Sequence, residues 1–208
     1  MILKPTINNS AMLGVLLCGG LSTRMESDKG LMHFQQNTWA EAAAKLFTQL
    51  DLPFIISVNS KQVKNYTSIF SADKLLTDNP ILQINGPLCG VLSAHIKYPN
   101  HNLLVLACDM PLMQKDLLQI LLNQYQTNAA FGAYYFLNNG QPEPLCAIYK
   151  ANALSTIYQL YQDKKLLKHS MKFVLEQISS AAITLDKDQV EYFKNFNARK
   201  DLNGLDPN

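Results

Sequence analysis

The chain contains 208 residues, of which 48% are apolar and 16% charged, and it carries a formal net charge of +2. This length is enough for one well-buried domain, and the composition is typical of a soluble globular protein. So small a net charge argues against nucleic acid or a membrane surface as a partner. No apolar run approaches the ~20 residues that cross a bilayer. We therefore expect a cytoplasmic protein with neither kind of partner.

The first residues and the cysteines both point to the same compartment. Residues 1–11 include Lys4 and several polar side chains but lack the apolar segment of a signal peptide. We interpret them as a flexible lead-in to a single domain over residues 12–208. The cysteines show no CxxC spacing and lie among apolar or small residues, at Cys18, Cys89, Cys108 and Cys146. We expect buried free thiols rather than disulfides or a zinc site.

Strand-like apolar runs alternate with helix-like segments along the chain. The run at 14–18 predicts a first strand, and Thr38 with Glu41 forms a capping box that begins the next helix. The apolar residues of that helix recur at helical spacing, at Trp39, Ala42, Ala43, Leu46, Phe47 and Leu50. There follow a strand over 54–58, a helix over 88–97, a strand over 103–107 and a helical stripe of Leu117, Leu118, Leu121, Leu122 and Tyr125.

Continuous apolar strands separated by helices predict a parallel sheet with both faces covered. The predicted fold class is therefore α/β, a single-domain, doubly wound and mostly parallel sheet. Ligands bind such sheets beyond the carboxyl ends of the strands. Three polar segments fall there, namely the loop after Cys18, the "VNS" after Ile56 and the "ACDMP" after Leu106. We expect the chemistry in one crevice at that edge.

The loop "CGGLSTRMESDKG" contains the residue types of an anion site. Gly19 and Gly20 let the backbone approach a ligand closely and direct N–H groups at it. Ser22 can donate a hydroxyl, and Arg24 and Lys29 can neutralise a polyphosphate. The spacing matches neither a Walker A loop nor a dinucleotide fingerprint. On these residues alone, a phosphate loop and an ordinary glycine turn with solvated charges both remain open.

The stretch "LCGGLSTRMESDKGLM" resembles the signature of the nucleotidyltransferases that attach a nucleotide to the molybdenum cofactor, roughly Leu-Ala-Gly-Gly-x-Ser-x-Arg-Met-Gly-x-Asp-Lys. Cys18 stands in place of the family's alanine, and Glu26 in place of its glycine. Further segments match in family order: "TDNPILQINGPLCG", "LACDMPLM", "EPLCAIY" and "FKNFNARKDL". Five motifs spread over residues 16–202 favour the phosphate loop over the glycine turn.

This resemblance implies that the terminal phosphate of molybdopterin attacks the α-phosphorus of GTP in line, and that pyrophosphate leaves. A divalent cation, Mg²⁺ or alternatively Mn²⁺, would bring the two anions together, and Asp109 matches the family's metal ligand. A turn residue or helix cap is the other interpretation of Asp109. Lys29 and Arg24 match the cations that stabilise the leaving pyrophosphate, so Lys29, Arg24 and Asp109 are the implied catalytic residues.

The resemblance also implies a nucleotide site, formed by Leu17, Cys18, Gly19, Gly20, Lys29, Asn59 and Asp78. Asp78 matches the carboxylate that accepts hydrogen bonds from guanine N1–H and N2–H₂. The alternative for Asp78 is an Asx-type turn before Asn79-Pro80. Cys18-Gly19-Gly20 resembles the branch of the family that uses GTP, because the CTP branch tends to read Ala-Ala-Gly.

The acceptor site implied by the resemblance comprises Gly86, Pro87, Leu88, Gly90, Asn195 and Asn197. The first four residues are otherwise only a turn that leads into a helix. Asn195 and Asn197 flank one residue of an extended segment, so their amides would face the same side and offer donors and acceptors to a pterin. Alternatively, these two asparagines cap a final helix near Ala198.

A basic helical patch is predicted from four lysines, Lys164, Lys165, Lys168 and Lys172. Such a patch is either a solvated face or a surface that steers an anionic cofactor. The partners implied are GTP, molybdopterin or the molybdenum cofactor, and proteins that deliver the cofactor or receive it as apo-molybdoenzymes. Two other functions stay open: a nucleotidyltransferase that uses CTP or another phosphorylated acceptor, and a non-catalytic GTP-binding accessory protein, which Glu26 would suit.

Overall fold

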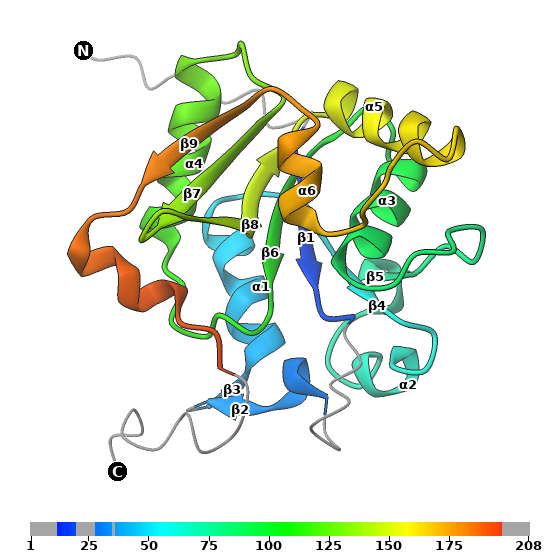
Figure 1. Cartoon of the computed structure of the whole chain (residues 1–208). Helices are drawn as coiled ribbons and strands as arrows, with labels where there is room; N and C mark the ends of the chain where they lie inside the picture. The colour runs from blue at the N-terminus through cyan, green and yellow to red at the C-terminus, as the bar shows by residue number, and fades with distance from the viewer. Residues whose placement is uncertain (1–11, 20–27, 35, 197–208) are drawn as a thin grey trace.

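The computed structural model describes residues 12–19, 28–34 and 36–196 (Figure 1). Several predicted positions therefore lie outside the described residues: the lead-in 1–11, Gly20, Ser22, Arg24, Glu26 and Asn197. All four cysteines are buried free thiols, as the sequence predicts. Within the described ranges, no helix is both long and apolar enough to span a membrane.

Seven strands form one sheet in the order β5-β4-β1-β6-β8-β7-β9. Their bounds are Met12–Leu17 (β1), Phe54–Val58 (β4), Leu75–Thr77 (β5), Asn102–Ala107 (β6), Ala133–Asn138 (β7), Gln141–Tyr149 (β8) and Ser180–Thr184 (β9). β1 pairs in parallel with β4 and β6, as do β4 with β5 and β7 with β9. β8 runs antiparallel to both β6 and β7. The predicted α/β class with a mostly parallel sheet is confirmed.

Helices cover both faces of this sheet (Figure 1). The helices α1 (Trp39–Gln49) and α4 (Lys115–Thr127) pack on one face. The other face carries α3 (Pro87–Lys97), α5 (Ala151–Gln162) and α6 (Met171–Glu176). The remaining elements are a short ladder of β2 (His33–Phe34) with β3 (Asn37–Thr38), the helix α2 (Val63–Tyr66) and the 3₁₀ helices η2 (Lys29–Leu31), η3 (Ala72–Lys74) and η4 (Lys187–Phe193). The sheet is therefore doubly wound.

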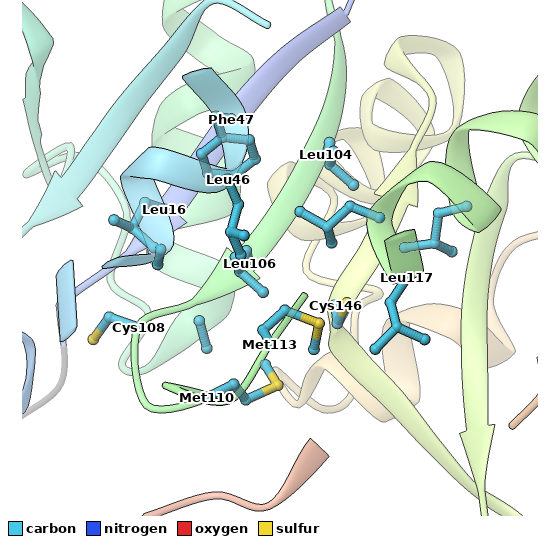
Figure 2. Close-up of a cluster of buried hydrophobic side chains, with 14 of the residues drawn as sticks. Leu16, Leu46, Phe47, Leu104, Leu106, Cys108, Met110, Met113, Leu117 and Cys146 are labelled. Atoms are coloured by element: carbon cyan, nitrogen blue, oxygen red, sulfur yellow. The ribbon is translucent and has the colours of Figure 1, made fainter. Parts of the chain in front are cut away.

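The core on the first face holds the strands that end at the site. Figure 2 shows Leu16 and Leu106 of the sheet in one cluster with Phe47 of α1 and Leu117 of α4. Gly14 of β1 lies against Phe47, because an added Cβ would come within 2.7 Å of Phe47 Cδ1. The close packing of α1 on β1 therefore requires glycine at this position.

Local sequence signals predict where several helices and strands begin and end. Thr38 Oγ1 accepts a hydrogen bond from Glu41 N at 3.2 Å, and Glu41 Oε2 accepts one from Thr38 N at 2.8 Å, which is the predicted capping box. The predicted strands at 14–18, 54–58 and 103–107 and the predicted helices are all present, with small differences at their ends. Hydrophobic period and helix caps were sufficient for these elements.

The predicted basic helical patch is wrong in its conformation. α5 ends at Gln162, and Lys164 has a φ of 56°, in the left-handed region that terminates helices. Lys165 and Lys168 lie in the irregular segment before α6, and Lys172 lies within α6. Three of these lysines therefore lie in the segment between α5 and α6 and one in α6, instead of all four sharing one helix face.

Candidate active site at the carboxyl edge of the sheet

Two of the predicted polar segments, those after β1 and β6, meet beside the end of β4. Cys18 N and Gly19 N donate to Ser57 O at 2.9 and 3.1 Å, and Cys108 N donates to Leu17 O at 3.1 Å. The strand ends are thus joined at the edge where ligands bind in such sheets. One expectation differs: the Gly19 amide already has a backbone partner, so it does not point into an anion nest in this structure.

A lysine and an aspartate face each other at this edge. Lys29 is the first residue of η2, and Asp109 follows the end of β6. Lys29 Nζ lies 3.4 Å from Asp109 Oδ2, and the two side chains are 23% and 26% exposed. An ion pair that remains partly open to solvent can exchange its contact for a phosphate or a metal ion. Two of the three predicted catalytic residues therefore meet, while Arg24 lies outside the described residues.

A hydrogen-bonded network anchors the backbone next to Lys29. Asp28 caps η2, and its Oδ1 accepts from Gly30 N and from Tyr66 OH, each at 3.0 Å. Its Oδ2 accepts from Gln62 Nε2 at 2.6 Å. Gln62 and Tyr66 escaped the sequence analysis because their partner lies 34 and 38 positions away in the chain. Their common position after β4, beside Asn59, was the one signal that could have drawn attention to them.

Asn59 follows β4 and lies beside the glycine loop. A Cβ added to Gly19 would lie 3.6 Å from Asn59 N. Asn59 Oδ1 accepts from Lys61 N at 3.0 Å and from Gln62 N at 3.2 Å, which is an Asx turn. Among the described residues no hydrogen bond involves the Asn59 Nδ2 group. That group is therefore the atom of Asn59 best able to donate to a ligand.

Asp78 follows β5, and its backbone N donates to Val58 O at 3.2 Å, next to the end of β4. Its carboxyl is half-buried and lies near the Cys89 thiol. Burial raises the pKa of Asp78, and the nearby Cys89 thiol opposes that rise. The Asx turn in this segment is formed by Asn79, whose Oδ1 accepts from Ile81 N at 3.0 Å. The alternative interpretation of Asp78 thus applies to its neighbour.

Asp78 also lines a pocket of about 320 Å³ between residues 76–80 and α3. The α3 side of this pocket is formed by Ser93, Ile96 and Lys97, in the second half of that helix. Because α3 begins at the carboxyl edge and runs away from it, the pocket extends away from Lys29 and Asp109.

The predicted acceptor segment forms the start of α3. Gly86 is the N-cap with a φ of 88°, a conformation that favours glycine, and Pro87 is the first helical residue. Gly90 packs against the end of β4, because an added Cβ would lie 2.5 Å from Ser57 Oγ. Leu88 is fully buried. The segment therefore lies at the same edge, with Gly86 and Pro87 as its accessible residues.

The end of the described chain returns to this edge. Phe196 N donates to Asp109 O at 3.2 Å, and the Phe196 ring packs edge-on against Trp39 with the ring centroids 6.2 Å apart. Asn195 precedes Phe196 and is exposed. The structure therefore brings Asn195 close to Asp109, whereas Asn197 lies outside the described residues.

A second carboxylate, absent from the predicted site, lies near the end of β6 that leads into Asp109. Because β8 runs antiparallel to β6, with Cys146 paired to Leu106, Glu143 lies in β8 just before the segment that pairs with β6, at the end where β6 leads into Asp109. Burial raises the pKa of Glu143; a hydrogen bond from Asn138 Nδ2 and the nearby Lys172 oppose the rise, and the charge of Asp109 adds to it. The antiparallel direction of β8, which the sequence did not reveal, is what carries Glu143 to this edge.

The donor set at this edge suits a hard divalent cation. No group of three or more His, Cys, Asp or Glu side chains could hold a metal in the part of the chain that the structure describes. Mg²⁺ does not need such a group, since one or two carboxylates are completed by water and substrate phosphates. Asp109 is 26% exposed and Glu143 is half-buried, so both offer carboxylate oxygens. The residues present fit the predicted ion.

An α/β sheet with a lysine and carboxylates at its carboxyl edge has the chemistry of a phosphate-binding edge, and comparison with known proteins shows the class of the chain. The chain belongs to the MobA-like NTP transferase domain family, whose model matches residues 14–181, and it is a nucleotidyltransferase. A probable molybdenum cofactor guanylyltransferase of Flavobacterium johnsoniae is 29% identical over 195 residues, 93% of this chain and 95% of that protein. One of Bacillus cereus is 28% identical over 190 residues, 90% and 92% of the two chains.

Solved structures share the fold. Molybdopterin-guanine dinucleotide biosynthesis protein A of Archaeoglobus fulgidus has a TM-score of 0.74 at 20% identity, covering 92% of this chain and 95% of its own. A cytidylyltransferase of Leptospira borgpetersenii has a TM-score of 0.65 at 12% identity, covering 94% and 84%. Because transferases named for different nucleotides share it, the fold alone does not select the base.

Proposed function

We propose that this nucleotidyltransferase transfers GMP from GTP to the terminal phosphate of molybdopterin or the molybdenum cofactor, forming the guanine dinucleotide cofactor and releasing pyrophosphate. The observation that carries this proposal is the Lys29–Asp109 pair, 3.4 Å between Nζ and Oδ2, at an edge that also holds Asn59 and Asp78. Two anionic reactants need a cation and a metal-binding carboxylate side by side. The names of the relatives from Flavobacterium and Bacillus support the choice of substrates.

The proposed step is an in-line displacement at the α-phosphorus of GTP. An oxygen of the acceptor phosphate bonds to this phosphorus while the bond to the bridging oxygen of the β-phosphate breaks, so negative charge grows on pyrophosphate. Lys29 would exchange its contact with Asp109 for the triphosphate and stabilise that charge, with Arg24 as a second cation. The protein contributes position and charge stabilisation and forms no covalent intermediate.

Mg²⁺, or Mn²⁺ in its place, is the expected cofactor. Asp109 would hold the ion, with Glu143 as the second carboxylate at this edge. When bound, the ion neutralises the phosphates and brings them together. The partial exposure of Asp109, 26%, leaves room for the water and phosphate ligands that such an ion keeps.

Recognition of guanine is assigned to Asp78. Its two oxygens would accept from the adjacent N1–H and N2–H₂ donors. Cytosine lacks this pair of adjacent donors and would leave a carboxylate oxygen unpaired, which disfavours CTP. Asn59 would donate to the nucleoside. Leu17, Cys18, Gly19 and Gly20 would border the triphosphate.

The acceptor would bind on the side of Gly86, Pro87 and Asn195. Asn195 and Asn197 supply amide donors and acceptors for a pterin, and Leu88 and Gly90 hold the start of α3 in place. Proteins that deliver molybdopterin and apo-molybdoenzymes that receive the product are the proposed partners, since the cofactor must enter and leave this open edge.

The proposal is tested by incubating the purified chain with Mg²⁺, molybdopterin and each nucleoside triphosphate in turn. We expect pyrophosphate release with GTP and a guanine dinucleotide product in the mass spectrum. Turnover with CTP alone would reject the assigned base. GTP binding without pyrophosphate release, unchanged by Asp109→Ala, would instead indicate a non-catalytic accessory protein.

A further inference from the structure

We propose that Gln62 and Tyr66 are positioning residues for Lys29: by holding Asp28, they set where the lysine ammonium meets the triphosphate. This inference rests on the proposed function, in which Lys29 stabilises the leaving pyrophosphate. Gln62 precedes α2 and Tyr66 is its last residue. Neither residue belongs to the glycine loop or to the other motifs of the sequence.

Asp28 connects Gln62 and Tyr66 to Lys29. Its carboxylate accepts three hydrogen bonds, from Gly30 N at 3.0 Å, Tyr66 OH at 3.0 Å and Gln62 Nε2 at 2.6 Å. Bonds to an ionised acceptor are stronger than those between neutral groups. Lys29 follows Asp28 directly and begins the 3₁₀ turn that Asp28 caps. The direction of the Lys29 side chain therefore depends on how Asp28 is held.

Gln62 joins three segments of the nucleotide site through one amide. Its Nε2 donates both to Asp28 and to Cys18 O, the latter at 3.1 Å, and its Oε1 accepts from Asn59 N at 2.9 Å. The side chain is 8% exposed. A glutamate at this position could still accept from Asn59 N, but it would have no N–H to donate to Asp28 or to Cys18 O. The network therefore requires an amide here.

The Tyr66 hydroxyl has little freedom to move. The side chain is fully buried, and a Cβ added to Gly30 would lie 2.1 Å from the hydroxyl oxygen. Burial, followed by the charges of nearby groups that include Asp28, raises the pKa of Tyr66 well above its usual range, so the hydroxyl stays a donor. Gly30 N and Tyr66 OH thus both hold the same oxygen of Asp28, Oδ1.

The geometry of Lys29 explains why such confinement matters. Its ammonium is a point charge on a flexible stem, with no planar fork to orient it. At the edge it must lie beside Asp109, now 3.4 Å away, and also reach the leaving phosphates. Displacing a catalytic group by about 1 Å lowers rates by up to ~10²-fold, so the anchor of its backbone affects turnover more than binding.

The first test is Tyr66→Phe, which removes one of the three hydrogen bonds that Asp28 accepts. The assay is pyrophosphate release with GTP, Mg²⁺ and molybdopterin. We expect kcat to fall about tenfold with the KM for GTP changed less than about twofold. Tyr134→Phe is the matched control, because Tyr134 is also fully buried and donates its hydroxyl to Asn128 O, far from Lys29 in the fold. This control should lower stability comparably and leave kcat unchanged.

The same substitution in a Lys29→Ala background separates positioning from general destabilisation. If Tyr66 acts through Lys29, the Tyr66→Phe change lowers kcat no further in that background. An equal fall in both backgrounds would overturn the proposal. A fall in stability without any change in kcat would overturn it as well.

The second test reverses the polarity of the bond between Gln62 and Asp28. Gln62→Glu places two carboxylates at a hydrogen-bonding distance and should lower kcat at least tenfold. Adding Asp28→Asn supplies an amide donor to Glu while Asn Oδ1 still accepts from Gly30 and Tyr66. We expect the double variant to recover most of the loss, incompletely because Cys18 O loses its donor. A double variant as slow as the product of the single effects would refute the coupling.

Failure of this inference is distinguishable from failure of the proposed function. A wild-type chain without guanylyl transfer, or a Lys29→Ala variant of normal turnover, rejects the proposed function first. An active chain that depends on Lys29 yet tolerates Tyr66→Phe and Gln62→Glu rejects the positioning role alone.

Discussion

The proposed nucleotide side and the proposed acceptor side of this site are held in different ways. On the nucleotide side Asp28 accepts three hydrogen bonds, and its donors Gln62 and Tyr66 are 8% and 0% exposed. On the acceptor side, Gly86 and Asn195 are both exposed. Buried, satisfied polar networks are rigid, and removing one member is costly, whereas exposed amides adapt. GTP is therefore expected to meet a preformed surface, and the acceptor a more adaptable one.

The largest effects should come from the pair at the centre of the nucleotide side. Lys29→Ala and Asp109→Ala should each lower turnover by at least ~10²-fold, about 2.7 kcal/mol of barrier. Stability should change little, because the pair is partly exposed. Lys165→Ala is the matched control, since Lys165 also lies 3.4 Å from a carboxylate, that of Asp163, but in the loop after α5. Near-normal turnover of both active-site variants would contradict the assigned roles.

Gly30→Ala should disrupt the hydrogen bonds around Asp28 on the nucleotide side without replacing a catalytic residue. The new methyl would lie 2.1 Å from the Tyr66 hydroxyl, so that hydroxyl must leave Asp28. We expect about tenfold lower kcat and about 1–3 kcal/mol lower stability by urea unfolding. Gly132→Ala, where the methyl would lie 2.8 Å from Ala153 Cβ, should destabilise the fold but keep kcat. Equal kcat in the two variants would show that the crowding has no catalytic consequence.

Glu143→Gln tests whether Glu143 binds the metal ion together with Asp109. If Glu143 shares the ion with Asp109, the Mg²⁺ concentration for half-maximal rate should rise about three- to tenfold. Saturating Mg²⁺ should restore kcat, because Lys29 and Asp109 are unchanged. A titration of pyrophosphate release against Mg²⁺ measures this. An unaltered Mg²⁺ dependence would separate Glu143 from the metal.

Asn195→Ala should produce a smaller effect confined to the acceptor side. Loss of one exposed amide should raise the KM for molybdopterin about three- to fivefold, in keeping with one hydrogen bond of roughly 1 kcal/mol. The KM for GTP should stay the same, because Asn195 makes no part of the network around Asp28. If instead the KM for GTP rose, the two sides would not be independent.

The smallest effect concerns His95 of α3, which lies away from both sides. His95 is 4% exposed, and its Nε2 lies 3.2 Å from Ser155 Oγ. Burial lowers its pKa below the ordinary 6.5. The unfolded chain therefore takes up a proton below about pH 6.5 that the folded chain does not, and stability falls as pH falls, by at most about 1.4 kcal/mol per pH unit. His95→Gln should flatten this slope in urea unfolding at pH 7.5 and 5.5, with unchanged activity at pH 7.5; equal slopes would assign the dependence to other groups.

Signals within a few residues of each other were enough to predict most of the fold and one edge of the site. The Thr38–Glu41 capping box, the buried runs of β1, β4 and β6 and the apolar stripe of α4 each depend on neighbours in the chain. Parallel strands joined by helices leave their carboxyl ends together, so the proximity of Lys29 and Asp109 follows from topology. The sequence motifs then indicated which residues at that edge are candidates for the site.

Residues that act across the fold could not be predicted in this way. Glu143 lies at the same end of the β6–β8 pair as Asp109 because β8 is antiparallel to β6, and an apolar strand gives no sign of its direction. Asp28 meets Gln62 and Tyr66 through contacts 34 and 38 positions apart. The Gly19 amide is occupied by Ser57 O, a partner on the neighbouring strand.

The local chain thus determined its helices, its strands and the place where chemistry can occur, because caps and hydrophobic period act over a few residues. Packing decided which polar groups meet there. Hydrogen bonds and charges act over a few ångströms, and only the folded sheet brings Asp28, Gln62 and Tyr66 within that distance.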